Sequence, residues 1–184
     1  YGSYYTAILL EEYGKDLFLN LLKEKGSSCD FLKNHYLSET QRNKMLDWML
    51  EVTSIFNYHE EFFFQSVRIM DDYLSHSKRV FNFQDIHIIG IISMYISSKI
   101  VEVNPLSLNE CCKNLSKGKI GTSVLQKYEI IMLESLNYTL NFPFTFTSTY
   151  FFKEIFLIQT FEYLDNSEEV KRFYNICLKF LMKL

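Results

Sequence analysis

Residues 86–101 read IHIIGIISMYISSKIV, the most apolar window of the chain. Isoleucines recur on every side of the helix that this window would form, and Asn82 is placed to cap it. A membrane-spanning helix needs about 20 largely apolar residues, so we predict a core helix over 84–101 that is buried among other helices, and no membrane partner. Gly90 lowers the helix propensity by about 1 kcal/mol relative to Ala, so we expect a neighbouring helix to approach closely there.

Two amphipathic helices precede this core helix. Ser38 and Gln41 form a capping-box pattern that begins a helix running to about Phe56. One face of that helix is apolar, at Met45, Trp48, Met49, Val52 and Phe56. We expect Asn57 to cap the next helix, which runs to about Ser75 with an apolar face at Phe63, Val67, Met70 and Leu74.

The sequence after the core helix is also helical. Ser107 and Glu110 form a second capping box before a short helix, and residues 117–121 form a loop with two glycines. Thr122 then begins a helix to about Asn137, with an inward face at Leu125, Tyr128, Met132 and Leu136. Further helices are predicted over 4–24, 146–162 and 166–183, which gives an all-α chain of about eight helices.

The composition fits one globular domain with no general affinity for nucleic acid. The chain has 184 residues, of which 48% are hydrophobic and 22% charged, with only 6 Gly and 2 Pro. A chain of this length buries roughly 70% of its unfolded surface, so it needs no metal or disulfide to fold. Its net charge of −3 and the lack of a basic stripe argue against direct nucleic-acid binding.

The sequence shows no pattern of catalytic or metal-binding residues. The cysteines stand at 29, 111, 112 and 177, and no two have the C-x-x-C spacing of a zinc or redox site. The four histidines (35, 59, 76 and 87) are scattered, and the loop 117–121 lacks the P-loop spacing. We therefore expect no cofactor, no metal and no enzymatic activity, and we interpret the cysteines as reduced thiols of an intracellular protein.

Four stretches, in order, resemble the cyclin box. Residues 42–52 read RNKMLDWMLEV, similar to the family's M-R-A-I-L-φ-D-W-L-φ-E-V, where φ is apolar. Residues 71–75 (DDYLS) resemble D-R-F-L-S, and Gly90 followed by residues 98–102 (SKIVE) resembles the family's glycine and A-S-K-F/Y-E-E. Residues 128–143 resemble the fourth motif, in which M-E is followed by L-x-F-x-L-x-x-P. Together they indicate a member of the cyclin family.

The resemblance implies a cyclin-like five-helix bundle over 37–143 with its third helix at the centre. Residues 1–36 would supply an N-terminal helix and its connection, and residues 144–184 additional C-terminal helices. Five further helices need roughly 70–90 residues, so the chain is either a one-box cyclin or a fragment. The implied function is to bind and activate a cyclin-dependent protein kinase, in control of the cell cycle or transcription, in the nucleus or cytoplasm.

Individual residues match the family's functional positions. The resemblance implies kinase contacts at Lys99, Ile100, Glu102 and Glu129, although core packing of Ile100 is an equal alternative. Arg42 and Asp71 match a structural ion pair, with Asp47 as the weaker candidate partner.

A groove for substrates or inhibitors carrying an R-x-L motif would use seven residues: Gln41, Lys44, Met45, Trp48, Glu51, Ile86 and His87. Gln41 and Lys44 replace apolar residues of the family there, which argues against R-x-L docking.

Three other functions stay open at this point. The chain could be a nucleic-acid-bound cyclin-fold protein resembling a general transcription factor core, which salt-dependent DNA binding would reveal. It could be a helical enzyme, which turnover without a kinase would reveal. It could be a cyclin-fold interaction module that does not activate a kinase, in which case charge reversal at Lys99 would affect no partner.

Overall fold

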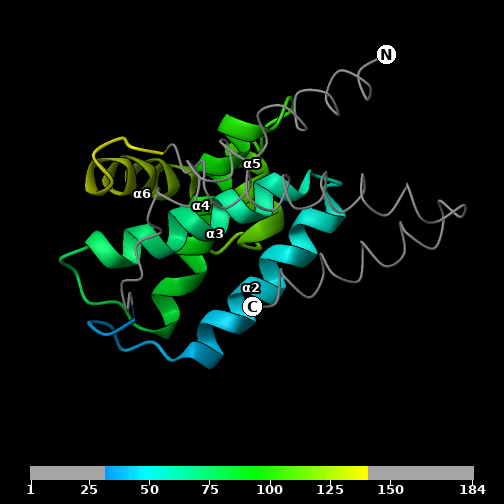
Figure 1. Cartoon of the computed structure of the whole chain (residues 1–184). Coiled ribbons are helices and arrows are strands. Elements are labelled where there is room, and N and C mark those ends of the chain that lie inside the picture. The colour runs from blue at the N-terminus through cyan, green and yellow to red at the C-terminus, as the bar shows by residue number, and fades with distance from the viewer. Residues whose placement is uncertain (1–31, 141–184) are drawn as a thin grey trace, which may run out of the picture. The chain divides into compact units, whose positions relative to one another are not determined.

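The computed structural model describes residues 32–140, which all fall within one compact unit spanning Cys29–Phe142 (Figure 1). Its helices are α2 (Glu39–Ile55), α3 (Glu60–His76), α4 (Phe83–Val101), α5 (Leu108–Glu110) and α6 (Thr122–Ser135). A π-helical turn, η1 (Cys111–Leu115), continues α5. Within residues 32–140 no strand forms, and one isolated bridge joins Tyr36 to Asn82. The all-α prediction is confirmed for this part of the chain.

The core helix predicted from the apolar window is α4. It packs against α2, α3, α6 and η1, and every residue from Ile89 to Ser98 is buried. The serines on α4 are buried without losing hydrogen bonds, because each hydroxyl finds a carbonyl oxygen: Ser93 donates to Ile89, Ser97 to Phe62 and Ser98 to Tyr95. The polar residues that distinguish this segment from a membrane span are therefore compatible with its central position.

Most of the predicted capping residues cap the N-termini of their helices. Complete capping boxes form at Ser38 with Gln41 and at Ser107 with Glu110, and Asn82 caps α4 in a third box with Asp85. The prediction that Asn57 caps α3 is wrong, because the N-cap is His59, whose side chain accepts from the Glu61 N–H. The last predicted helix within the described residues ends at Ser135 rather than Asn137.

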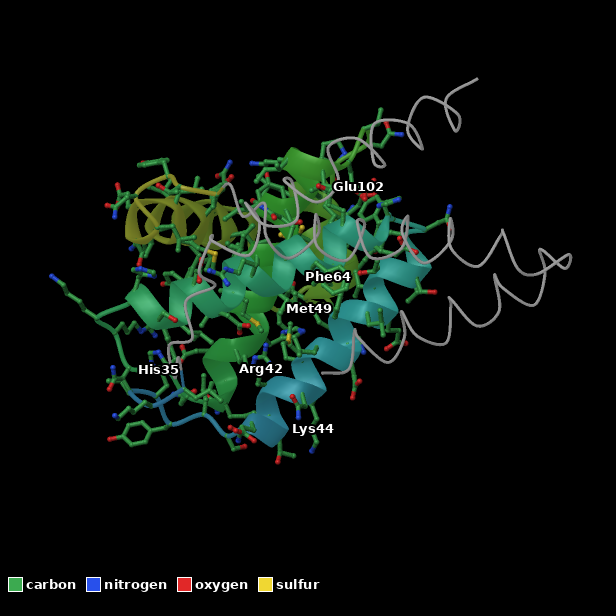
Figure 2. All side chains as sticks on the ribbon, viewed as in Figure 1. His35, Arg42, Lys44, Met49, Phe64 and Glu102 are labelled. Atoms are coloured by element: carbon green, nitrogen blue, oxygen red, sulfur yellow. The ribbon has the colours of Figure 1, made fainter. Side chains whose placement is uncertain are left out.

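The close approach expected at Gly90 comes from α2. A Cβ added at Gly90 would collide with the end of the Met45 side chain. Met45 is 5% exposed and Met49, one turn further along α2, is fully buried (Figure 2). Gly90 therefore leaves room for the Met45 side chain between α2 and α4, which offsets the loss of helix propensity.

The segment before α2 is hydrogen-bonded to the α3–α4 loop. The Tyr36 N–H donates to the Phe81 carbonyl oxygen at 2.9 Å, and the Phe81 N–H donates to His35 Nδ1 at 3.3 Å. His35 Nε2 lies 2.8 Å from the Leu74 carbonyl oxygen, so the ring bridges the last turn of α3 and the loop before α4 (Figure 2). The helices predicted over 4–24, 146–162 and 166–183 lie outside the described residues.

Candidate functional site

The two charged residues predicted to contact a kinase meet at the end of α4. The Nζ atom of Lys99, in the last turn of α4, lies 2.6 Å from Oε1 of Glu129 in the middle of α6. The Lys99 side chain is 41% exposed and that of Glu129 is 17% exposed, so the ion pair lies at the protein surface, with Lys99 the more accessible to solvent.

The Tyr95 ring packs against the Lys99 side of this ion pair. The Lys99 ammonium lies 4.0 Å from the centre of the Tyr95 ring, in the geometry of a cation–π contact. Partial burial alone lowers the pKa of Lys99, but the hydrogen bond to Glu129 and the contact with Tyr95 outweigh it, so the pKa lies above its ordinary value. Lys99 therefore keeps its positive charge at neutral pH. The sequence analysis did not identify Tyr95 as a site residue, although it stands four residues before Lys99 on the same helical face.

Apolar side chains are exposed beside the pair. Ile100 is 51% exposed and Val103, just beyond the end of α4, is 94% exposed. Core packing of Ile100 is therefore excluded within the described part of the chain. A cation, a carboxylate and exposed aliphatic side chains thus occur at or just beyond this end of α4, a combination suited to docking a partner rather than to chemistry.

Glu102 has a local role at the same end of the bundle. It forms the C-cap of α4, and its Oε1 accepts from the His59 N–H at 3.0 Å, next to the start of α3. The neighbouring Tyr58 hydroxyl donates to the Asn104 carbonyl oxygen at 3.0 Å. Glu102 thus lies near the Lys99 surface but also joins the α2–α3 turn to the segment after α4, and sequence reasoning missed these partners because they are far apart in the chain.

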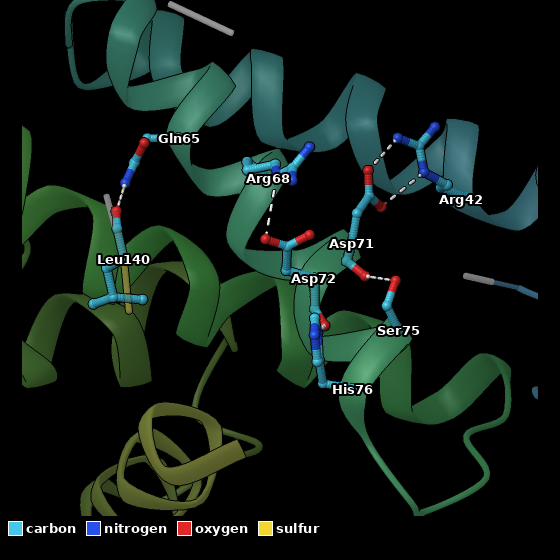
Figure 3. Close-up of polar contacts among 8 residues, drawn as sticks. All are labelled: Arg42, Gln65, Arg68, Asp71, Asp72, Ser75, His76 and Leu140. Carbon is cyan, nitrogen blue, oxygen red and sulfur yellow. Dashed lines mark hydrogen bonds and ion pairs between the residues drawn. The ribbon is translucent and has the colours of Figure 1, made fainter. Parts of the chain in front are cut away.

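Arg42 and Asp71 form the predicted ion pair between α2 and α3 (Figure 3). Arg42 Nε donates to Asp71 Oδ1 at 3.0 Å and Nη2 donates to Oδ2 at 2.7 Å, a two-pronged geometry. Both side chains are 16% exposed. Burial raises the pKa of the Asp71 carboxyl, and the guanidinium opposes that rise. The pair is a structural link that fixes α2 on α3.

Six of the seven residues predicted for a docking groove do line one. A groove of about 310 Å³ lies between α2 and α4 and is lined by Gln41, Lys44, Met45, Trp48, Ile86 and His87, together with Phe83 and Gln84. Glu51 is outside this lining. Phe83 and Gln84 were not predicted, although they stand one helical turn before Ile86 and His87.

The described residues offer neither a metal site nor a membrane span. Between residues 32 and 140 no group of three or more His, Cys, Asp or Glu side chains is arranged to hold a metal ion. In the same range no helix combines the length and the apolar character needed to cross a bilayer. Cys111 and Cys112 are free thiols, and burial raises the pKa of the Cys111 thiol to about 12.

Comparison with known proteins identifies the family. The family model for the N-terminal domain of cyclins matches residues 16–141. The chain belongs to the cyclin family. A G1/S-specific cyclin-E from Hemicentrotus pulcherrimus is 30% identical over 125 residues, covering 65% of this chain and 29% of that cyclin. The S-phase entry cyclin-5 of Saccharomyces cerevisiae is 26% identical over 142 residues, covering 73% of this chain and 32% of the yeast protein.

A solved cyclin structure has the same fold. The crystal structure of a viral cyclin from herpesvirus saimiri matches with a TM-score of 0.60 and 24% identity, covering 70% of this chain and 55% of the viral chain. The cyclin fold predicted from the four sequence motifs is therefore confirmed. The matched region spans about a third or less of the length of the curated cyclins named above.

Proposed function

We propose that this cyclin binds a cyclin-dependent serine/threonine kinase and stabilises its active state. The observation that carries the proposal is the Lys99–Glu129 ion pair, 2.6 Å long and open to solvent, beside the exposed Ile100. The relatives' names, which include G1/S-specific, S-phase entry and G2/mitotic-specific cyclins, favour a role in the cell cycle over one in transcription. Such a role would be exercised in the nucleus or cytoplasm.

The chemistry of the pair suits a docked protein loop. A Lys ammonium has three N–H donors, and Lys99 uses one for Glu129. Its remaining donors, and the second carboxylate oxygen of Glu129, can therefore bond backbone groups of a partner. Ile100 adds an apolar contact beside them. In kinases the helix that carries the ion-pairing Glu must be in place for phosphoryl transfer, so a partner that binds only that arrangement activates the enzyme.

Activation requires that this surface bind the active kinase more tightly than the inactive kinase by a minimum free energy. Shifting a kinase from 1:99 to 99:1 in favour of the active state requires about 5.5 kcal/mol of differential binding. A charge-assisted hydrogen bond contributes about 1.5–3 kcal/mol, so one bond from each of Lys99 and Glu129 supplies about 3–6 kcal/mol. Both residues must therefore engage, and losing either should abolish most of the activation.

The direct test is kinase activation. The purified chain is mixed with a panel of inactive cyclin-dependent kinases from the same organism, and phosphoryl transfer to a histone-type peptide is measured. We expect activation of at least one kinase, lost in Lys99→Glu. The matched control is Lys78→Glu, since Lys78 is exposed and precedes the opposite end of α4, roughly 25 Å away at 1.5 Å per residue.

Two results would contradict the proposal. One is the absence of both activation and co-elution with every kinase of the panel, which would favour a cyclin-fold interaction module without kinase activation. The other is activation that Lys99→Glu leaves intact while circular dichroism shows the variant to be folded, which would place the kinase contact elsewhere on the surface.

A further inference from the structure

A small pocket of about 220 Å³ lies between the second half of α3 and the turn that follows α6. Asp72 and His76, one helical turn apart, line it from α3, and Leu136, Asn137 and Thr139 line it from the turn. None of the site residues predicted from the sequence lines this pocket. Its size suits a single long side chain or a small group rather than a folded segment.

The lining of the pocket is rich in hydrogen-bond acceptors. Asp72 is the only Asp, Glu, Lys or Arg among the lining residues, and its side chain is 13% exposed. Its Oδ2 accepts from Arg68 Nε at 3.2 Å, which leaves the lone pairs of Oδ1 for a further donor (Figure 3). Asn137 and Thr139 add an amide oxygen and a hydroxyl oxygen, which can both accept as well.

A hydrogen bond of His76 determines how its ring can act. Nδ1 lies 2.8 Å from the Asp72 carbonyl oxygen (Figure 3). A carbonyl oxygen only accepts hydrogen bonds, so Nδ1 carries the proton and Nε2 of the neutral ring is an acceptor. The pocket therefore suits a group that donates several hydrogen bonds and carries a positive charge.

The turn that forms one wall of the pocket is held by hydrogen bonds to backbone carbonyl groups. The Thr139 N–H donates to the Leu136 carbonyl oxygen at 2.9 Å, across Asn137, whose φ of 50° lies in the left-handed region. Beyond the turn, Gln65 Nε2 on α3 donates to the Leu140 carbonyl oxygen at 2.7 Å (Figure 3). The wall is thus fixed against α3, and a preformed pocket loses less free energy to ordering when a ligand binds.

Asp72 also departs from the family at this position. It stands where the D-R-F-L-S motif of the cyclin box has arginine. In this chain α3 therefore carries a short carboxylate in place of a long cationic side chain, and the pocket lies beside it. Both the space and the charge are complementary to a guanidinium that comes from outside the domain.

We propose that this pocket binds an arginine side chain of a partner protein, with the guanidinium on the Asp72 carboxylate and the methylene groups against Leu136. A guanidinium has five N–H donors in a planar fork, and its contacts with carboxylates are among the strong charge-assisted hydrogen bonds. The ammonium of lysine is compact and lacks this fork. The inference goes beyond kinase regulation, because it assigns a second contact surface to α3 and the turn after α6.

The test uses three short peptides that differ in one residue, which is arginine, lysine or citrulline between glycines and serines. Citrulline has the shape of arginine without its charge, so it is the matched control. The peptides are titrated into the full chain at low salt, and the backbone amide NMR signals of Asn137 and Thr139 report on the pocket. We expect the arginine peptide to shift these signals and to bind about tenfold more tightly than the citrulline peptide, with the lysine peptide between them.

Variants test the role of the carboxylate. Asp72→Asn should weaken the arginine peptide to the level of the citrulline peptide, and Asp72→Arg, which restores the residue of the motif, should abolish binding. Asp47→Asn is the matched control, since Asp47 is exposed on α2 and lines no part of the pocket. Thr139→Val removes an exposed hydroxyl without touching the Arg68–Asp72 contact and should weaken the arginine peptide by a smaller factor. Circular dichroism checks that each variant is folded.

Three outcomes would overturn the proposal. Equal binding of the arginine and citrulline peptides would refute the charge assignment. Signals of Asn137 and Thr139 that respond to none of the peptides would refute docking at the pocket. Signals that move with the concentration of the protein instead would assign the pocket to a second copy of the chain. The assay contains no kinase, so its failure is separate from failure of the proposed function, and Lys99→Glu should retain binding of the arginine peptide.

Discussion

The end of the Met45 side chain occupies the space that a Cβ on Gly90 would need. Met45 belongs to α2 and Gly90 to the centre of α4, so a side chain at position 90 would force the end of the Met45 side chain to move. Met45 also lines the groove between α2 and α4. The packing of the core and the shape of the groove are therefore coupled through one flexible side chain.

The first prediction concerns Gly90→Ala. The new methyl group gains about 1 kcal/mol in helix propensity, while overpacking against Met45 costs about 1–3 kcal/mol. We expect a net loss of stability in urea unfolding, and a changed Trp48 fluorescence because Met45 must move within the groove. In the double variant Gly90→Ala/Met45→Ala the two effects should not add, with a coupling of about 0.5–3 kcal/mol. Additivity of the two substitutions would contradict the contact.

The second prediction concerns the Arg42–Asp71 pair. Each side chain is 16% exposed, so removing one partner leaves a largely buried charge without its main counter-ion. We expect Arg42→Met or Asp71→Asn to lower the free energy of unfolding by about 3 kcal/mol. The double variant Arg42→Met/Asp71→Leu should be more stable than the less stable single variant. Losses below 1 kcal/mol in both single variants would show that the pair is not a structural link.

Much of this fold could be predicted because its signals are local. Capping boxes need residues three positions apart, and the buried helix needs a single apolar run, so Ser38, Asn82 and Ser107 could be placed from the sequence. The wrong prediction at the start of α3 also has a physical reason. Asn57 adopts a φ of 52°, a left-handed conformation that Asn tolerates, and it belongs to the turn that ends α2. His59 then acts as the cap.

In the candidate site, too, some features could be predicted from the sequence and others could not. Lys99 with Glu129 and Arg42 with Asp71 could be paired because the family resemblance brings distant helices together, and the structure places both pairs within hydrogen-bonding distance. The π-helical turn at Cys111–Leu115 has no sequence period that would reveal it. The approach of Lys117 and Lys119 to His87 depends on how the loop after that turn folds back, which no short-range pattern encodes.

The third prediction concerns charge exchange at the proposed kinase surface. The double variant Lys99→Glu/Glu129→Lys can restore an ion pair within the cyclin, but it reverses the charge presented at each position. If each residue bonds the kinase directly, as we propose, kinase binding should stay lost in the double variant while thermal stability stays near that of the original chain, because the exchanged side chains can form an ion pair with each other again. Co-elution with the kinase on gel filtration measures the binding, and its recovery would limit the pair to positioning α4 on α6.

The fourth prediction concerns the pH response of the groove. Burial and the charges of Lys119 and Lys117 lower the pKa of His87 below its ordinary 6.5, so the ring stays neutral beside Trp48 at neutral pH. On acidification the imidazolium forms and quenches the indole, so Trp48 fluorescence should fall with a midpoint below pH 6.5. The unfolded chain takes up this proton first, so the free energy of unfolding should also fall as the pH drops from about 6.5 through the lower pKa of the folded state. His87→Gln should remove the fluorescence response and its share of the stability change, and Lys119→Gln should move the fluorescence midpoint upward. A midpoint above 6.5 in the original chain would contradict the positive surroundings assigned to His87.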